Sequence, residues 1–409
     1  MQLFEELAAE LHSAWNERGR DELAFPTLAQ NLLDRFQPAS AIRVEDVFGW
    51  LVAAGDLPRQ FDPQSSFGNF SLTVAARDDF HIDLLVWTDS TTAIHQHTFS
   101  GAFHVLLGSS LHTLWSFEES RRWSDRLKRG KLRIRATEWL RTGTTRAILP
   151  GAAMIHSLFH IESPSVTVVV RTPSSAVVSP QLTYERSGLA YDTHLALGRV
   201  EKVRQLLCLL WTSGHPERIA LSDAAISGLD PYSAVRVLAS IRPHTPAGTQ
   251  ERLIDMVALR DPELAELLRD TVIRKARDRA LVELRKLTAD PRHRLLLALV
   301  LNLPDRGSID SVLRQIVPGE LPEEWLWDTI RSMRDSPGQR LGRENVLGFA
   351  LNKVSEEALR MLLRGHSIDD VAGIVAGHEE LMDDARALCS TLAAQPLLGP
   401  LLGRQLATA

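Results

Sequence analysis

Cysteine is scarce in this chain, with two residues among 409, Cys208 and Cys389. Both stand in apolar sequence of helical spacing, so we expect reduced core residues rather than a disulfide. Several enzyme motifs are also missing: there is no Cys-x-x-Cys pair, no P-loop, no Gly-x-Gly-x-x-Gly after a predicted strand and no Gly-x-Ser-x-Gly elbow. These absences argue against a cysteine-ligated zinc site, the common phosphate-binding loops and a serine-hydrolase elbow.

An excess of one charge and long apolar runs are equally lacking. The formal net charge is −5 and the pI is near 6.3, which gives no reason to expect nucleic acid or an anionic membrane as a partner. The most apolar run, from Leu295 to Leu303, is too short to span a bilayer. The opening residues are acidic and amphipathic and lack the basic and apolar regions of a signal peptide, so we expect a cytoplasmic protein.

Hydrophobic periodicity divides the chain into three parts. Residues 1–60 carry apolar side chains at helical spacing, and residues 192–409 do so almost throughout. Between them, residues 61–185 hold short β-rich runs separated by Gly, Ser, Asp and Pro, which is typical of a sandwich or barrel. The predicted fold class is α+β and multidomain. We expect a jelly-roll β-barrel, a short N-terminal helical segment packed on it, and a large all-α C-terminal domain.

Histidines mark the β-rich part as the place where chemistry is expected. On a β-strand, residues i and i+2 project from the same face, so His95 and His97 of Ile94-His-Gln-His97 can converge on one metal ion. His156 is the predicted third ligand, and His160, four residues later, competes for that role. Three imidazoles leave coordination positions open for substrate and O2, as in non-haem iron oxygenases. The alternative is that these are ordinary strand histidines.

Two motifs carry a resemblance to known proteins. Residues 150–160 approximate the second cupin motif, Pro-x-Gly-x-x-His-x-x-x-Asn, with His156 at the ligand position. Residues 94–100, Ile-His-Gln-His-Thr-Phe-Ser, resemble the Ile-His-x-His-Thr-x-Ser of the cysteine dioxygenase (thiol dioxygenase) family, and residues 80–87 and 164–173 are similar to strands of that family. The resemblance covers roughly residues 69–175. It implies a cupin-type barrel with a mononuclear Fe(II) held by His95, His97 and His156.

The chain departs from that family around the metal motif. Gly101-Ala102 takes the place of the cysteine that forms a thioether crosslink, and Thr167, Val169 and Arg171 replace the Ser-x-His-x-Tyr run. No arginine stands near Phe70, where the family has one that grips the substrate carboxylate. These departures leave the metal-binding residues in place but remove groups with which the family holds cysteine.

The predicted catalytic residues are Arg171, His160 and His104. Strand alternation places Arg171 on one face with Thr167 and Val169. If that face is inside the barrel, its guanidinium suits a carboxylate or phosphate; the alternative is a strand-end arginine in solvent. We expect His160, unless it is itself a ligand, to orient a ligand or hold a substrate. His104 is expected to point inward beside the metal, against the alternative of a surface histidine.

Other polar residues near the motifs have simpler interpretations. We expect His81 and His112 to be structural or exposed, and Glu138 to be a solvated strand residue. The basic run from Arg121 to Arg135 is expected to form a solvated hairpin, with anion or partner binding as the alternative.

Together these features predict a mononuclear non-haem Fe(II)-dependent oxygenase that acts with O2 on a small anionic or thiol-containing metabolite. Another divalent transition metal is the alternative cofactor. The second hypothesis is a non-catalytic cupin-like ligand-binding or scaffold protein. In either case, the helical half from residue 192 is where a protein partner or a homodimer is expected.

Overall fold

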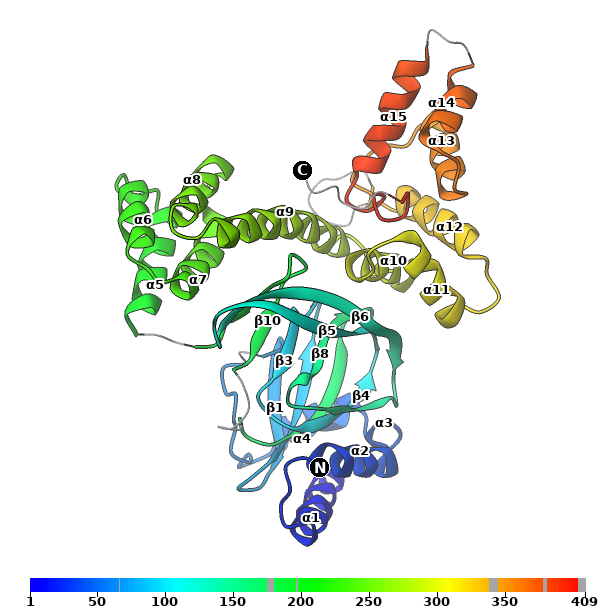
Figure 1. Ribbon diagram of the computed structural model, residues 1–409. Coiled ribbons are helices and arrows are strands. Elements are labelled where there is room, and N and C mark those ends of the chain that lie inside the picture. Colours follow the sequence, from blue (N-terminus) through cyan, green and yellow to red (C-terminus); the bar gives the residue numbers. More distant parts are fainter. Residues whose placement is uncertain (66, 175–179, 196–197, 338–344, 378–380, 404–409) are drawn as a thin grey trace.

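The computed structural model describes residues 1–65, 67–174, 180–195, 198–337, 345–377 and 381–403. N-terminal helices, a β-rich body and a long helical region follow one another along the chain (Figure 1). The predicted architecture, a β-barrel with helices on both sides in sequence, is therefore confirmed. Among the described residues, no helix has the length and apolar character needed to cross a bilayer.

The N-terminal helices cover one face of a β-sheet. In α1, Phe4, Leu7 and Leu11 recur at helical spacing, and all three are buried against the sheet together with α2 residues such as Phe25. The helices are α1 (Gln2–Glu17), α2 (Phe25–Phe36), α3 (Pro38–Ala41) and α4 (Val44–Ala53).

The β-rich body consists of two sheets. One has five strands in the order β1-β2-β9-β4-β7, and the other is a closed barrel in the order β10-β11-β6-β5-β8-β3. The strands are β1 (Phe70–Ala76), β2 (His81–Trp87), β3 (Ile94–His97), β4 (Gly101–Leu107), β5 (Ser109–Ser124), β6 (Leu127–Arg141), β7 (Thr145–Ile148), β8 (Gly151–His160), β9 (Ser165–Arg171), β10 (Leu182–Tyr184) and β11 (Leu189–Asp192). The predicted end of the β-rich part, residue 185, lies between β10 and β11. The sequence does not predict β11, because the four residues 189–192 are too few to show a strand pattern.

Strand alternation gives the five-stranded sheet two different faces. Side chains such as Leu84 and Val168 pack on the N-terminal helices, whereas Leu85, Phe103 and Val169 lie in a second core that includes residues of the other sheet. This second core lies between the two sheets, and it surrounds the candidate site.

Helices make up the rest of the chain. A single hydrophobic core joins Leu111, Phe159 and Ile161 of the β-rich body to helices of this region. The elements are α5 (Gly198–Thr212), α6 (Arg218–Ser227), α7 (Pro231–Ile241), η1 (Arg242–His244), α8 (Ala247–Ala258), α9 (Pro262–Arg285), α10 (Pro291–Asn302), α11 (Arg306–Ile316), α12 (Pro322–Asp335), α13 (Lys353–Leu363), α14 (Ile368–Ala376) and α15 (Met382–Ala394).

Two buried arginines attach these helices to the β-rich body. Arg285, at the end of α9, is 0% exposed, and its guanidinium donates to the carbonyl oxygens of Ser90 and His160. Arg294 of α10 pairs with Asp89 at 2.6 Å. Figure 1 shows α9 as a long helix that crosses above the strands. Because the two guanidinium groups hydrogen-bond to backbone carbonyls and to a carboxylate of the β-rich body, they fix the position of α9 and α10 on the barrel.

The basic hairpin formed by β5 and β6 is not simply solvated. Arg121 pairs with Asp261 at 2.9 Å and also with Glu263, and Arg129 pairs with Glu263 at 2.7 Å. Both acidic residues belong to the start of α9. The expectation of a solvated hairpin is therefore wrong for these two arginines, because a segment more than a hundred residues away supplies their carboxylates.

Replacing Arg285 by Ala is expected to lower the free energy of unfolding by about 2–4 kcal/mol, because the buried His160 carbonyl loses its hydrogen bond from the guanidinium and the change opens a cavity. Urea unfolding followed by circular dichroism measures this loss. Arg279→Ala is the control, since Arg279 is exposed on the same helix and its loss should change stability by less than about 0.5 kcal/mol. Equal effects of the two substitutions would contradict this account of the contact.

Candidate metal centre

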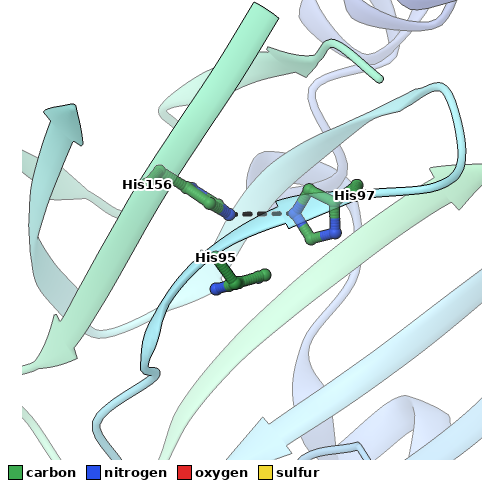
Figure 2. A group of neighbouring side chains, drawn as sticks. All are labelled: His95, His97 and His156. Carbon is green, nitrogen blue, oxygen red and sulfur yellow. Dashed lines mark hydrogen bonds between the residues drawn. The ribbon is translucent and has the colours of Figure 1, made fainter. Parts of the chain in front are cut away.

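His95, His97 and His156 come together between the two sheets, although 59 residues separate the second from the third. The antiparallel pairing of β3 with β8 sets His95 directly opposite His156. Their neighbours Ile94 and Ile155 belong to a separate core, so alternation turns the histidines toward the five-stranded sheet. Figure 2 shows the three side chains converging from these two strands.

A register shift brings His97 into the group. Uninterrupted antiparallel pairing from His95–His156 would put His97 opposite Met154, yet its partner is Gly151. The extra residues form an irregularity in β8, which begins at Gly151 with a φ of 60°. Glycine adopts this left-handed conformation without the strain a side chain would impose. Such bulges re-aim side chains in sheets, and here the bulge accompanies the approach of His97 to His156.

The three imidazoles are close together and buried. Their ring centroids are 4.6 Å apart for His95 and His97, 4.7 Å for His95 and His156, and 5.0 Å for His97 and His156. The Nε2 atoms of His97 and His156 lie 2.9 Å from each other (Figure 2). All three side chains are buried. Each offers one nitrogen within 4.8 Å of the others, which is the donor set of a three-histidine metal site.

Unpartnered nitrogens support the fit of a metal ion. His95 Nδ1 lies 2.8 Å from the carbonyl oxygen of Ala93, so it carries the proton and leaves the Nε2 lone pair free. No hydrogen-bond partner within the described residues reaches His95 Nε2 or His97 Nδ1, although both are buried. A buried lone pair without a donor is costly, and coordination of a cation would satisfy it.

Burial also keeps these rings neutral, as metal ligands must be. It lowers the pKa of His95 to about 4, even though the Ala93 carbonyl acts in the opposite direction. Burial, followed by repulsion from neighbouring cationic groups, holds the pKa values of His97 and His156 well below the usual value. The imidazoles therefore offer lone pairs at neutral pH.

A hydrogen-bonded chain leads away from His156. His156 Nδ1 lies 2.9 Å from His112 Nε2, and His112 Nδ1 lies 2.9 Å from a carboxylate oxygen of Glu138. Arg146 binds the same carboxylate at 2.5 Å. Although burial raises it, hydrogen bonds from His112 and Arg146 bring the pKa of Glu138 down to about 2. An ionised acceptor at the far end requires the proton on Nδ1 of both rings, so the Nε2 of His156 carries the lone pair and faces His97.

Sequence reasoning missed this chain. The sequence predicts a structural or exposed His112 and a solvated Glu138, yet the side chain of His112 is 1% exposed and in direct contact with His156. The register of β5 was the missing information: β5 pairs with both β6 and β8, which sets His112 opposite Glu138 on one side and Leu158 on the other. An i, i+2 pattern cannot reveal a contact across three strands.

His95 lines both a small cavity and a larger cleft. A cavity of about 40 Å³ lies among the three histidines and apolar side chains such as Phe103 and Val169. A cleft of about 640 Å³ lies on the other side of His95, between the loop at 89–93 and helices α9 and α10. The small cavity has room for little more than an ion and water, so a substrate would have to approach through the larger cleft.

Arg171 lies where strand alternation predicted, since it lines the small cavity together with Thr167 and Val169. It is not a solvated strand end. Its Nη2 pairs with buried Asp83 at 2.6 Å, and the guanidinium lies over Phe99 at 5.5 Å. Burial raises the pKa of Asp83, but His81 and Arg171 outweigh it and the net shift is downward. The arginine thus reaches the site already bound to a carboxylate, and its catalytic role stays a prediction.

His160 lies apart from the three-histidine group. On β8 it is four residues beyond His156, which is roughly 13 Å along an extended strand. Its Nδ1 contacts the hydroxyl groups of Ser110 and Ser165 at 2.9 and 2.7 Å, and its ring stacks on Trp87 at 4.8 Å. Between the two rivals for the third position, the geometry favours His156 and makes His160 a core residue.

His104 does not point toward the metal centre, so that expectation is wrong. Its Nδ1 lies 2.9 Å from Thr145 Oγ1, and its Nε2 accepts a hydrogen bond from the backbone N–H of Ala39 at 3.2 Å. Along β4, Phe103 and Val105 face the site, while Ala102 and Leu106 face the N-terminal helices. His104 shares the helix-facing side by strand alternation, which the sequence alone could not orient.

No protein-family model matches the chain, and no curated protein sequence matches it. Among solved structures, it is similar to a cupin-2 domain protein from Shewanella frigidimarina, at 14% identity over 32% of this chain and 94% of that one, with a TM-score of 0.20. A hydroquinone 1,2-dioxygenase from Sphingomonas is similar at 13% identity over 27% of this chain and 69% of that one, with a TM-score of 0.21. An oxalate oxidase follows at 17% identity over 32% and 66%, with a TM-score of 0.20. Likeness at these TM-scores carries no weight for fold or activity, and the resemblance to cysteine dioxygenases stays a prediction.

Acidification is expected to destabilise the metal-free protein between pH 7 and pH 5. In the unfolded chain His95 has a pKa near 6.5, whereas in the folded protein its pKa is about 4. Between these values the unfolded state binds more protons, so the free energy of unfolding falls as the pH drops. For His95 alone the loss at pH 5 is about 2 kcal/mol. Urea unfolding with EDTA at both pH values measures it. The variant His95→Asn should lose about 2 kcal/mol less over this interval, and identical pH slopes for both proteins would refute the assignment.

Removing His112 is expected to weaken metal binding without removing a ligand. His112→Gln should lower the affinity for Fe(II) or Co(II) about 10- to 100-fold, because His156 loses the partner that orients its ring. Competition with a chromophoric chelator measures the affinity. His104→Gln, a change at a buried histidine on the helix-facing side, is the control and should bind metal like the unmodified protein. Unchanged affinity in both variants would argue against the orienting contact.

Proposed function

We propose that the protein is a mononuclear non-haem Fe(II)-dependent oxygenase with His95, His97 and His156 as the metal ligands. The observation that carries this proposal is the buried cluster of three neutral imidazoles, in which His95 Nε2 and His97 Nδ1 have no hydrogen-bond partner within the described residues. The cofactor could be another divalent transition metal, since imidazole ligands suit several.

When bound, Fe(II) held by three neutral ligands would keep its full positive charge and open positions for an anionic or thiolate group and for O2. The residues of the chain would set the surroundings. Ala93 and the His112–Glu138 pair orient two of the ligand rings, and the apolar walls exclude bulk water. These contacts allow the site to retain its geometry when the substrate arrives.

A small, anionic or thiol-containing metabolite is the proposed substrate. The cleft above His95 carries Lys275, Arg186 and His194, together with Glu185 and Asp278. Such a mixed surface favours a compact polar molecule over a large apolar one. Arg171 lines the small cavity beside the three histidines, and its Nη1 makes no hydrogen bond within the described residues. Because that cavity is small, we assign Arg171 a contact only with the anionic group of the substrate that reaches the metal, while the rest of the molecule stays in the larger cleft.

The decisive experiment is His97→Ala, assayed for bound metal and for oxygen uptake. The variant should lose at least 90% of its iron, because two imidazoles bind a ferrous ion with an affinity that is lower by roughly 10-fold or more. Its circular dichroism spectrum should not change. His160→Gln is the matched control from the other candidate position and should keep its iron. Elemental analysis after anaerobic purification gives the occupancy, and an oxygen electrode with a panel of thiols and small acids gives turnover.

Two results would overturn the proposal. Full iron occupancy in the His97→Ala variant would remove His97 from the ligand set. Iron-free unmodified protein that consumes no O2 with any thiol or acid of the panel would favour the non-catalytic ligand-binding alternative.

A further inference from the structure

A second large cleft lies apart from the histidines. It has a volume of about 1030 Å³ and is bounded by residues 132–137 of β6 and by residues of α9 and α11. In Figure 1 these helices lie above the β5–β6 hairpin. The size is at the upper end of small-molecule sites. The cleft forms only where the helical region packs on the barrel, because both contribute its walls.

Arginine dominates the charge of this cleft. The lining residues within the described part of the chain include five arginines and no aspartate, glutamate or lysine. Two come from β6, one from the turn between β10 and β11 and two from α9, so three distant segments contribute. They are Arg133, Arg135, Arg186, Arg274 and Arg277.

The most buried part of the cluster shares one carboxylate. Arg186 donates to Asp278 at 2.7 Å, and Arg277 lies 3.8 Å from the same side chain. Arg277 also donates to the carbonyl oxygen of Val300 at 2.8 Å. Burial lowers the pKa of Arg277, the charge of Asp278 raises it, and the nearby guanidinium groups of Arg186 and Arg274 lower it, so that the net shift is downward. Repulsion among these like charges is therefore only partly relieved by the protein.

The outer part has even fewer partners. Arg274 binds Asp270 through its Nε at 2.8 Å, which leaves its two terminal nitrogens without a hydrogen bond in the described residues. Arg133 lies 3.6 Å from Glu118, and both side chains are exposed. Arg135 has neither a hydrogen bond nor an ion pair within the described residues. Arg135 is the last residue of the basic run 121–135. Unlike Arg121 and Arg129, it does not pair with an acidic residue at the start of α9.

The cleft carries a net positive charge. Five guanidinium groups face three carboxylates, so two positive charges are left uncompensated in this part of the structure. Guanidinium forks match the oxygen geometry of phosphate groups and can bind two oxygens at once. Apolar side chains such as Leu301 and Ile134 line the same cleft and suit the non-charged portion of a ligand.

We propose that this cleft is a binding site for a small polyphosphate of nucleotide size, such as a nucleoside di- or triphosphate. The site contains none of the three histidines, although Arg186 and Asn302 also line the cleft above His95. It uses side-chain arginines instead of the glycine-rich loop that the sequence lacks. Adjacent phosphates bridge the β6 arginines and the α9 arginines, and the base and sugar lie along the apolar wall.

Calorimetric titration of the full chain with ATP, with EDTA present and at low salt, tests the site. Binding should be saturable and one to one. The variant Arg135→Ser/Arg274→Gln should bind at least tenfold more weakly, because two charge-assisted contacts are lost. Arg252→Ala removes an exposed arginine of α8 that pairs with Asp223 outside the cleft, and it should bind like the unmodified protein. Circular dichroism and thermal unfolding establish that each variant is folded.

Three outcomes would overturn the proposal. The first is the absence of measurable heat with millimolar ATP, pyrophosphate and inorganic phosphate. The second is equal weakening by the double variant and by Arg252→Ala, which would reduce the effect to general electrostatics. The third is binding confined to long single-stranded RNA with none to ATP, which would make the cleft part of an extended macromolecular surface.

Discussion

The pairing of β3 with β8 is the constraint on which the candidate site depends. It places His95 opposite His156, and the irregularity that begins at Gly151 brings His97 to the same point. A slip of one residue would turn every side chain of β3 to the opposite face. Each imidazole is held by a strand that is itself paired on both sides, so the geometry does not rely on a loop.

Burial of the three rings decides the chemistry that this arrangement can support. The rings stay neutral because burial opposes their protonation, and the same burial strengthens the contacts with Ala93 and His112 that orient them. The ionised carboxylate of Glu138 stands at the outer end of the chain, where Arg146 compensates its charge. The contact with His112 therefore controls which nitrogen of His156 faces the centre, while the charge of Glu138 stays one side chain away from that ring.

The helical region packs directly on the barrel. Arg285 and Arg294 bind carbonyl and carboxylate groups of the β-rich body, and Phe159 packs in the helical core. Helices α9 and α10 contribute walls to the cleft above His95, and α9 and α11 contribute walls to the arginine cleft. Arg186 and Asn302 line both clefts, so the two hollows share a wall that forms where the helices meet the barrel.

The sequence by itself determined the order of helical and β-rich parts and the common face of His95 and His97, because hydrophobic periodicity and the two-residue repeat of a strand are local properties. Only the tertiary structure decided which face of β4 carries His104, that His156 and not His160 joins the group, and that His112 and Glu138 lie behind it. Those outcomes depend on strand register and on contacts between distant segments, such as the seat of α9 on the barrel. No local pattern encodes such contacts, since they follow from how whole sheets and helices pack.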